Sequence, residues 1–180
     1  MGFFYTGKGD KGVSNVGTKK VPKDSPIIEA LGDCDELNSL LGVVRSSVAD
    51  RELNRKLVSV QENLFIIQAR IAWLMFPEHD SPQMTEEKIR AMEKEIEKME
   101  EEIAPERGFI IPGENTTASW LDFTRAVSRR VERSVVKVNK EHKLPEELLT
   151  YLNRLSSYLY ALARLEISRT KTKEKKPTYK

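Results

Sequence analysis

A chain of 180 residues, 39% of them hydrophobic, is long enough to bury the core of one compact domain. Its 30 Lys and Arg residues nearly balance 28 Asp and Glu residues, and the net charge of +2 excludes the broad positive field that binds nucleic acid or anionic membranes. The single cysteine, Cys34, excludes an internal disulfide and is typical of a reducing cytoplasm, where we expect the protein to act. We also expect no signal peptide, and no apolar run reaches the roughly 20 residues that span a bilayer.

The first 24 residues are rich in Gly, Lys and Asp, which predicts a loop. After them, apolar residues recur at helical spacing in five stretches. The predicted helices run from Ser25 through Val44, about Asp50 to Phe76, about Thr85 to Ile103, about Thr116 to Glu141 and about Pro145 to Thr170. The third is so rich in Glu and Lys that only a narrow seam can pack, and the rest is expected to be a solvated outer face.

The connections between these helices are short, and no segment shows the sustained alternation of a strand. The last ten residues, Lys171 to Lys180, are polar and basic, and we expect them to fray. This pattern predicts an all-α fold, a ferritin-like five-helix bundle that forms a single domain over residues 1–180.

Residues 7–12 read Gly-Lys-Gly-Asp-Lys-Gly and formally match the dinucleotide-binding pattern G-x-G-x-x-G. That pattern requires a βαβ unit, and a P-loop or a protein kinase requires further motifs that are absent here. Glycines nevertheless let backbone N–H groups approach an anion. Lys8, Lys11 and Lys23 add positive charge, and Ser14 and Asn15 can donate hydrogen bonds. The segment is therefore either a phosphate-binding loop or a flexible surface terminus.

The fourth predicted helix has two contrasting faces on a helical wheel. Its apolar face carries Trp120, Thr124, Val127, Val131, Val135 and Val138. The opposite face carries Arg125, Arg129, Glu132 and Arg133. Three guanidinium groups so close together repel one another unless anions lie among them, and a polyphosphate would supply negative charge in the bidentate geometry that arginine favours. The alternative is a solvated face on which Arg129 pairs with Glu132.

Two further polar residues lie beside apolar stripes. Asn153, in the last helix, is either a satisfied polar group of the core or a residue that reads a base or ribose by hydrogen bonding. Asp35 adjoins the apolar face of the first helix, where a lone carboxylate would be costly unless it were paired. We expect a basic partner such as Arg125.

Several segments between Tyr5 and about Arg164 match, in order, the motifs of a known family. They are Thr6 to Gly12 with Ser14, then Lys23, Gly32 to Ser39, Phe109 to Gly113, Arg125 with Arg129 to Arg133, and Leu152 to Ser156. Each is weak alone, but the complete ordered set is highly specific. The chain therefore resembles the PduO-type cobalamin adenosyltransferases, which move the 5′-deoxyadenosyl group of ATP onto the reduced cobalt of a corrinoid.

The resemblance implies a homotrimer of five-helix bundles with sites between neighbouring subunits. The ATP-binding residues that it implies are Thr6, Gly7, Lys8, Gly9, Asp10, Gly12, Ser14, Asn15, Lys23, Arg129, Arg130, Glu132, Arg133 and Asn153. Phe109 would pack on the lower corrin face and displace the axial base. Asp35 and Arg125 would form an intersubunit ion pair beside the corrinoid. Arg129, Arg125, Asp35 and Phe109 are thereby the residues expected to support catalysis.

The implied chemistry needs no general base, because cob(I)alamin is itself a strong nucleophile that attacks the 5′ carbon while triphosphate leaves. The protein would position the 5′ carbon, and Arg129, Arg133 and a Mg²⁺ carried on the ATP phosphates would neutralise the leaving charge. No protein-bound metal site is expected. A corrinoid reductase and an adenosylcobalamin-dependent enzyme are the protein partners that the resemblance suggests.

The sequence departs from the family pattern at three positions. Gly7 stands where Lys or Arg is usual, although Lys8 would substitute; Asp122 stands where many members have His; and Glu114 stands where a second Gly is common. None touches the arginine motif, so we expect effects on affinity or rate and not on the type of reaction.

Other function classes fit less well. A di-metal bundle needs Glu-x-x-His pairs, and neither His79 nor His142 has a Glu three residues earlier. A helical interaction module would leave the glycine motif unexplained. A non-catalytic sensor of ATP or corrinoid on the same fold would keep the arginine motif and is the main alternative.

Overall fold

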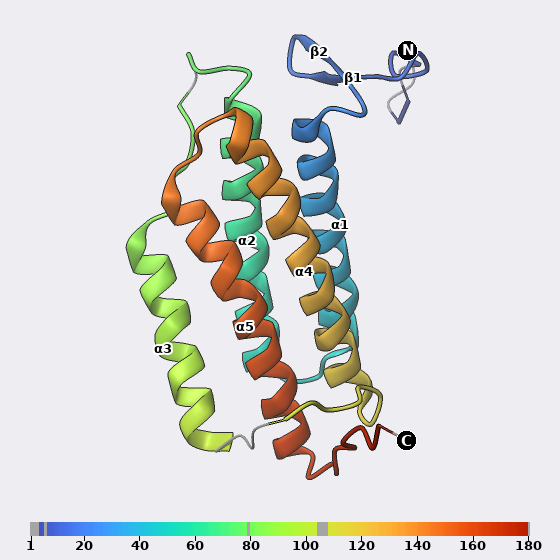
Figure 1. The fold of residues 1–180 in the computed structure, drawn as a ribbon, viewed down its shortest axis with the longest axis vertical. Coiled ribbons are helices and arrows are strands. Elements are labelled where there is room, and N and C mark those ends of the chain that lie inside the picture. Colours follow the sequence, from blue (N-terminus) through green and yellow to red (C-terminus); the bar gives the residue numbers. More distant parts are fainter. Residues whose placement is uncertain (1–3, 6, 79, 104–107, 180) are drawn as a thin grey trace.

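The structure is a computed structural model and describes residues 4–5, 7–78, 80–103 and 108–179. In these ranges the elements are β1 (Val13–Val16), β2 (Lys19–Pro22), α1 (Pro26–Ser47), α2 (Arg51–Trp73), α3 (Glu86–Ile103), α4 (Thr116–Glu141) and α5 (Glu146–Arg169). Successive helices run in opposite directions, and the two termini lie at opposite ends of the bundle (Figure 1). The predicted five-helix bundle is confirmed.

Side-chain caps set where three of the helices begin. Ser25, Asp50 and Asn115 each accept a hydrogen bond from a backbone N–H in the first turn of α1, α2 and α4. α2 ends at Trp73, before the predicted end at Phe76, because the chain tightens there into a turn in which the N–H of Phe76 donates to the carbonyl of Trp73 at 2.8 Å.

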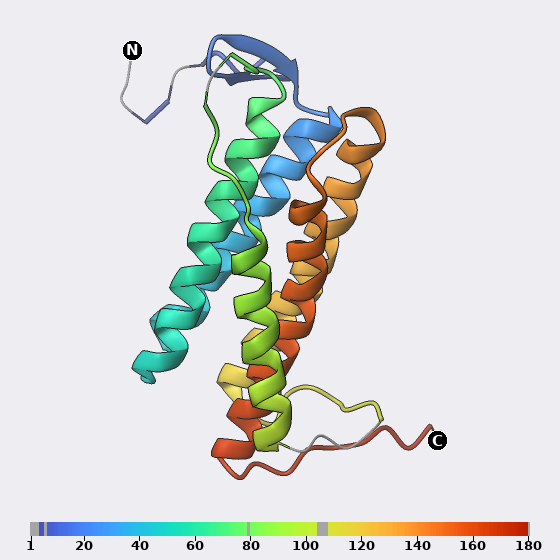
Figure 2. The same ribbon diagram turned by 90° about the vertical axis from the view of Figure 1, so that its left-hand side faces the viewer.

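The core lies between the helices, with α4 packed between α1 and α5, α3 against α5 and α2 against α1 (Figure 2). α5 contributes the leucine stripe that the sequence predicts: Leu148, Leu152, Leu155, Leu159 and Leu162, all buried. A buried polar link also joins three helices, because Asn63 on α2 donates to the Tyr151 hydroxyl at 3.1 Å and accepts from Lys88 at 2.9 Å. No helix in the described ranges is both long and apolar enough to cross a bilayer.

The prediction that the N-terminal region is only loop is wrong, because β1 and β2 form an antiparallel hairpin with Val13 opposite Pro22 and Val16 opposite Lys19. Gly17 has φ 55° and occupies the first turn position, where a two-residue II′ hairpin requires glycine. The tip then lies against the end of α2 (Figure 2).

The prediction of a frayed C-terminal tail is wrong for the segment 171–175, which contacts the rest of the molecule. The backbone N–H of Ile111 donates to the carbonyl of Lys175 at 2.8 Å, in an isolated antiparallel bridge. The tail is therefore bound to the loop before α4, and this contact was not evident from the composition of either segment.

Candidate functional site

The arginine-rich face of α4 lies outside the core, as the wheel predicts. Arg129 and Arg133 are exposed and stand one turn apart, because four residues make about one helical turn. Among the described residues neither side chain has an ion pair or a hydrogen bond, so Arg129 does not pair with Glu132. Arg130 differs, since it pairs with Glu36 and, at 3.5 Å, with Asp33 of α1. Two cationic side chains thus remain available for an anion.

Asn153 is exposed, which excludes its interpretation as a polar group of the core. Its Nδ2 donates to Glu132 Oε1 at 2.9 Å, and its Oδ1 accepts from Arg154 at 2.8 Å. The fold therefore brings Asn153 of α5 to the arginine-rich face of α4. Two residues predicted to bind ATP, Asn153 and Glu132, are in direct contact.

A pocket of about 500 Å³ opens at the end of the bundle where α4 begins, between α3, α4, α5 and the loop before α4. The side chains that matter for its chemistry are Phe109, Asp122, Arg125, Arg129, Tyr160 and Arg164. Phe109 is 78% exposed, so its ring is available to a ligand and contributes little to the core. The pocket joins an aromatic surface to the start of the arginine-rich face.

The wall of this pocket contains a buried charge network. Arg164 pairs with Asp122, and both side chains are less than 10% exposed. Asp122 Oδ1 also lies 3.7 Å from Nε of Arg125. The ring of Tyr160 faces both cations, with its centroid 5.0 Å from Arg164 Cζ and 5.8 Å from Arg125 Cζ. Arg125 thus lies between Asp122 and Tyr160 of its own chain, and its Nε makes no hydrogen bond among the described residues.

The expectation that Asp35 needs a partner such as Arg125 is wrong within this chain. Asp35 is exposed, and Arg125 instead lies beside Asp122. The neighbouring Cys34 is the buried member of this segment, and burial followed by the negative charges of Asp33 and Asp35 raises the pKa of its thiol to about 12. Cys34 is therefore a neutral core residue, and an ion pair of Asp35 with another subunit stays a prediction.

The glycine-rich segment owes its shape to backbone conformations that favour glycine. Gly7 and Gly12 have φ 65° and 73°, in the left-handed region. A Cβ atom on Gly9 would lie 3.2 Å from the Nζ atom of Lys23, which places this ammonium directly over the segment. The backbone N–H of Lys23 also donates to the carbonyl oxygen of Gly12, with an N–O distance of 2.9 Å. The predicted phosphate-binding residues Lys23 and Gly9 are thus brought together.

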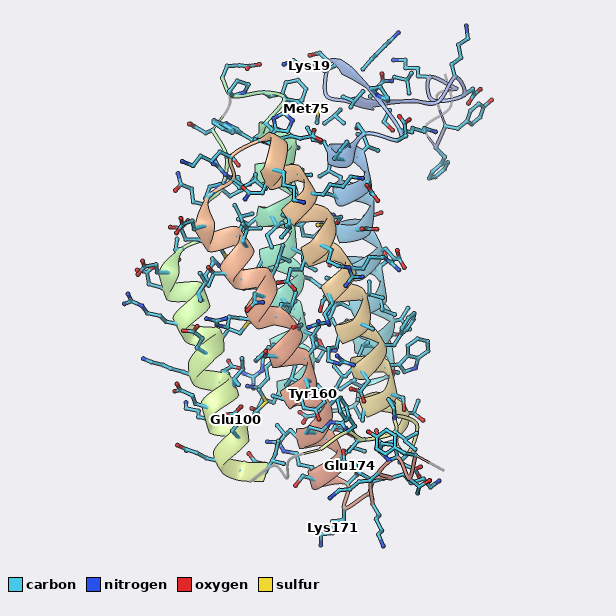
Figure 3. All side chains as sticks on the ribbon, in the orientation of Figure 1. Lys19, Met75, Glu100, Tyr160, Lys171 and Glu174 are labelled. Carbon is cyan, nitrogen blue, oxygen red and sulfur yellow. The ribbon has the colours of Figure 1, made fainter. Side chains whose placement is uncertain are left out.

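The other N-terminal candidates lie on the same segment or in the hairpin that follows it. Lys8 and Asp10 are exposed, and Ser14 and Asn15 lie in β1, where they face Val21 and Lys20 across the hairpin. Thr6 lies outside the described residues. The hairpin end of the molecule, marked by Lys19 and Met75, is opposite the end that carries Tyr160 and Glu174 (Figure 3).

The residues that form the charge network of the pocket wall with Arg125, namely Tyr160, Arg164 and Asp122, were not predicted to belong to a site. On a helical wheel Arg164 lies opposite the leucine stripe of α5, so local spacing gave no signal that its guanidinium would be buried and paired. Among the described residues, no group of three or more His, Cys, Asp or Glu side chains lies close enough to hold a metal ion.

Comparisons with known proteins agree with one another. A family model described as Cobalamin adenosyltransferase matches residues 4–166. The corrinoid adenosyltransferase PduO of Salmonella typhimurium is 38% identical over 91% of this chain, which spans only 49% of that protein. The corrinoid adenosyltransferase of Bacillus subtilis is 34% identical, over 92% of this chain and 87% of its own length. A solved PduO-type ATP:corrinoid adenosyltransferase variant from Lactobacillus reuteri, complexed with cobalamin and ATP, has a TM-score of 0.91 at 28% identity, over 97% of this chain and 99% of that chain.

Proposed function

The chain belongs to the cobalamin adenosyltransferase family, and from this premise we propose that it transfers the 5′-deoxyadenosyl group of ATP to the Co(I) centre of a corrinoid. The electron pair of Co(I) forms the bond to the 5′ carbon. The bond from that carbon to the phosphate oxygen breaks, and its electron pair leaves with triphosphate. The products are the adenosylated corrinoid and triphosphate.

The observation that carries this proposal is the pair of exposed arginines on α4. Arg129 and Arg133 have no side-chain partner among the described residues, and Arg129 also lines the pocket beside Phe109. Guanidinium groups stabilise negative charge that grows on a leaving phosphate chain, because they are fixed and bidentate donors. Arg129 thus stands between a surface for the phosphates and a surface for the corrinoid.

On the corrinoid side, the exposed ring of Phe109 would pack against the lower face of the macrocycle and displace the axial base. Arg125, which lies beside Asp122, would be at the edge of the same pocket. On the nucleotide side, Lys23 and the glycine-rich segment would bind the phosphates, with Asn153 and Glu132 near the nucleoside. These roles combine the family resemblance with the positions of the side chains.

Two further features belong to the proposal. Mg²⁺ would arrive on the ATP phosphates and add to the stabilisation of the leaving charge. The protein would act as a homotrimer in the cytoplasm, with each site shared between neighbouring subunits and with a corrinoid reductase or an adenosylcobalamin-dependent enzyme as partner. Tyr160, which lines the Phe109 pocket, lies far from the hairpin end of the molecule marked by Lys19 (Figure 3), and this separation supports a shared site.

An anaerobic assay tests the reaction itself. Purified protein is mixed with chemically reduced cob(I)alamin and Mg-ATP, and the visible spectrum is followed for conversion to adenosylcobalamin. We expect turnover that requires ATP. Binding of ATP without any turnover would contradict the transferase and favour the non-catalytic sensor on the same fold.

A further inference from the structure

The chain turns back on the bundle directly after α5. Lys171 has φ 51°, in the left-handed region, and its N–H donates to the carbonyl of Ser168 at 3.0 Å. The N–H of Thr172 donates to the carbonyl of Ile167 at 3.1 Å, so α5 ends in a Schellman motif. Residues 171–175, which we call the strap, therefore run across the end of the bundle and do not continue along the axis of α5 (Figure 1).

The strap contacts the loop of residues 108–115, which carries Phe109. The backbone N–H of Ile111, two residues from Phe109, donates to the carbonyl of Lys175 at 2.8 Å. The Nζ atom of Lys175 also lies 2.9 Å from Glu114 Oε1. This ion pair adds little on its own, because the lysine is 70% exposed, whereas the backbone bridge fixes where the loop lies.

A second connection passes through the pocket wall. The guanidinium of Arg164 binds Glu174 of the strap through Nη1 and Asp122 of α4 through Nη2. Arg164 and Asp122 are buried, and the Glu174 side chain is 31% exposed. Asp122 also lies beside Arg125, and Tyr160 faces both arginines, so the strap is connected to the cation at the pocket edge.

We propose that Glu174 is a positioning residue for the corrinoid, because it fixes both Arg125 and the loop that carries Phe109. The proposal rests on the proposed function, since it takes the pocket lined by Phe109 as the corrinoid site. Glu174 does not line that pocket and acts through Arg164 and through the backbone of the strap. The family match ends at residue 166, before the strap begins, so Glu174 lies outside the matched segment.

The substitution Glu174→Gln tests this role, because it removes the charge while nearly preserving the size of the side chain. Arg164 keeps its partner Asp122, so no buried charge is left alone and the fold is expected to persist. Lys173→Gln is the matched control: it neutralises an exposed charge of the strap that has no ion pair among the described residues.

Two measurements on the full chain separate positioning from general stability. Hydrogen–deuterium exchange of the peptide over residues 108–115 reports on the loop, and absorbance titration gives the Kd of cob(II)alamin at saturating Mg-ATP. In Glu174→Gln we expect faster exchange at Ile111 and a Kd for cob(II)alamin that rises on the order of tenfold, as for a lost charge-assisted hydrogen bond. The Kd of ATP stays unchanged, and Lys173→Gln changes none of the three.

Unchanged exchange in Glu174→Gln would overturn the proposal, because the strap would not hold the loop. Faster exchange with an unchanged Kd for cob(II)alamin would also overturn it, since the strap would then only stabilise the fold. Equal weakening of ATP and cob(II)alamin would exclude a role specific to the corrinoid. Neither measurement requires turnover: a wild-type protein that binds both substrates without transfer contradicts the proposed function alone, and one that does not bind cob(II)alamin contradicts both.

Discussion

The two ends of the helical bundle are built in different ways. At the end where α1 begins, the glycine-rich segment is mostly exposed, and its shape depends on backbone turns at Gly7 and Gly12. At the opposite end, the surroundings of Phe109 depend on the buried side chains of Arg164 and Asp122. We call the end with the glycine-rich segment the nucleotide end and the end with Phe109 the corrinoid end, after the ligands that we propose for them. We expect the nucleotide end to adjust when a polyphosphate binds, and we expect the corrinoid end to be formed before its ligand binds.

The two ends of one chain are far apart, so a site that uses both needs a second copy of the chain. α4 has 26 residues and is therefore about 39 Å long, with Arg125 in its first half and the hairpin near its far end. Each chain thus carries its glycine-rich segment and its Phe109 pocket in separate places. A neighbouring copy that supplies one of them would complete the site, as the family resemblance implies.

The largest expected effect lies between the two ends, at Arg129. Arg129→Ala should lower kcat by about 10²–10³-fold, the usual cost of removing one charge-stabilising donor. Stability should hardly change, because the side chain is exposed and has no partner among the described residues. Turnover of the anaerobic reaction and thermal unfolding give the two readouts. Arg130→Ala is the contrasting variant, because Arg130 differs from Arg129 in having an ion-pair partner, Glu36 of α1. Near-normal turnover in Arg129→Ala would contradict the role proposed for Arg129.

Mixed assemblies test whether the two ends belong to different subunits of one site. Lys23→Ala removes a cation from the nucleotide end, and Arg129→Ala removes a cation from the arginine-rich face. Each pure variant should therefore be nearly inactive. If a homotrimer shares each site between neighbours, random mixing of equal amounts restores about a quarter of the wild-type sites, because one interface in each mixed trimer is intact. Co-refolded protein is assayed for turnover, and no recovery would place both residues in the site of one chain.

Phe109→Ala tests the corrinoid end and should have the next largest effect. Because the ring is 78% exposed, its removal should leave the melting temperature unchanged. The loss should fall on the reduction of bound Co(II), by about tenfold or more, since a lower ligand would no longer be excluded. ATP titration and the spectrum of bound cob(II)alamin distinguish the two ends. Weaker ATP binding with an unchanged corrinoid spectrum would assign Phe109 to the nucleotide instead.

The sequence predicts well what depends on local spacing. The five helices and the two faces of α4 follow from apolar residues at helical intervals, and Val127, Val131, Val135 and Val138 are buried as expected. The hairpin was missed because four-residue strands are too short to show alternation. The signal for it was a glycine-containing turn, Gly17-Thr18, between two short runs that contain valine.

Contacts between distant segments set the limit of such prediction. The docked tail depends on Arg164, Glu174 and Lys175 meeting partners far away in sequence, which no local pattern reveals. The structure explains two departures from the family pattern by ion pairs. Asp122 is the buried partner of Arg164, and Glu114 is the partner of Lys175. The individual roles of the ATP and corrinoid residues, in contrast, remain predictions that the substitutions above test.

The smallest expected effect concerns how the nucleotide end is attached to the bundle. Gly17 has φ 55°, and a Cβ atom there would lie 2.8 Å from Cζ of Phe76, whose ring also faces the Lys19 ammonium at 5.3 Å. Gly17→Ala therefore strains the turn by about 1–2 kcal/mol and moves the tip of the hairpin off α2. We expect the KM for ATP to rise severalfold, because the hairpin adjoins the segment that we propose to bind the phosphates.

The corrinoid end should not respond to this change, so the Kd of cob(II)alamin in Gly17→Ala should equal that of the wild type. Gly42→Ala is the matched control, since a Cβ atom there meets only Gln61 at 3.9 Å, an ordinary contact. Steady-state kinetics with ATP varied and then with the corrinoid varied separates the two ends. If the KM for ATP and the KM for the corrinoid rose together, the hairpin contact would stabilise the whole fold. That result would contradict the expectation that the two ends of the bundle respond independently.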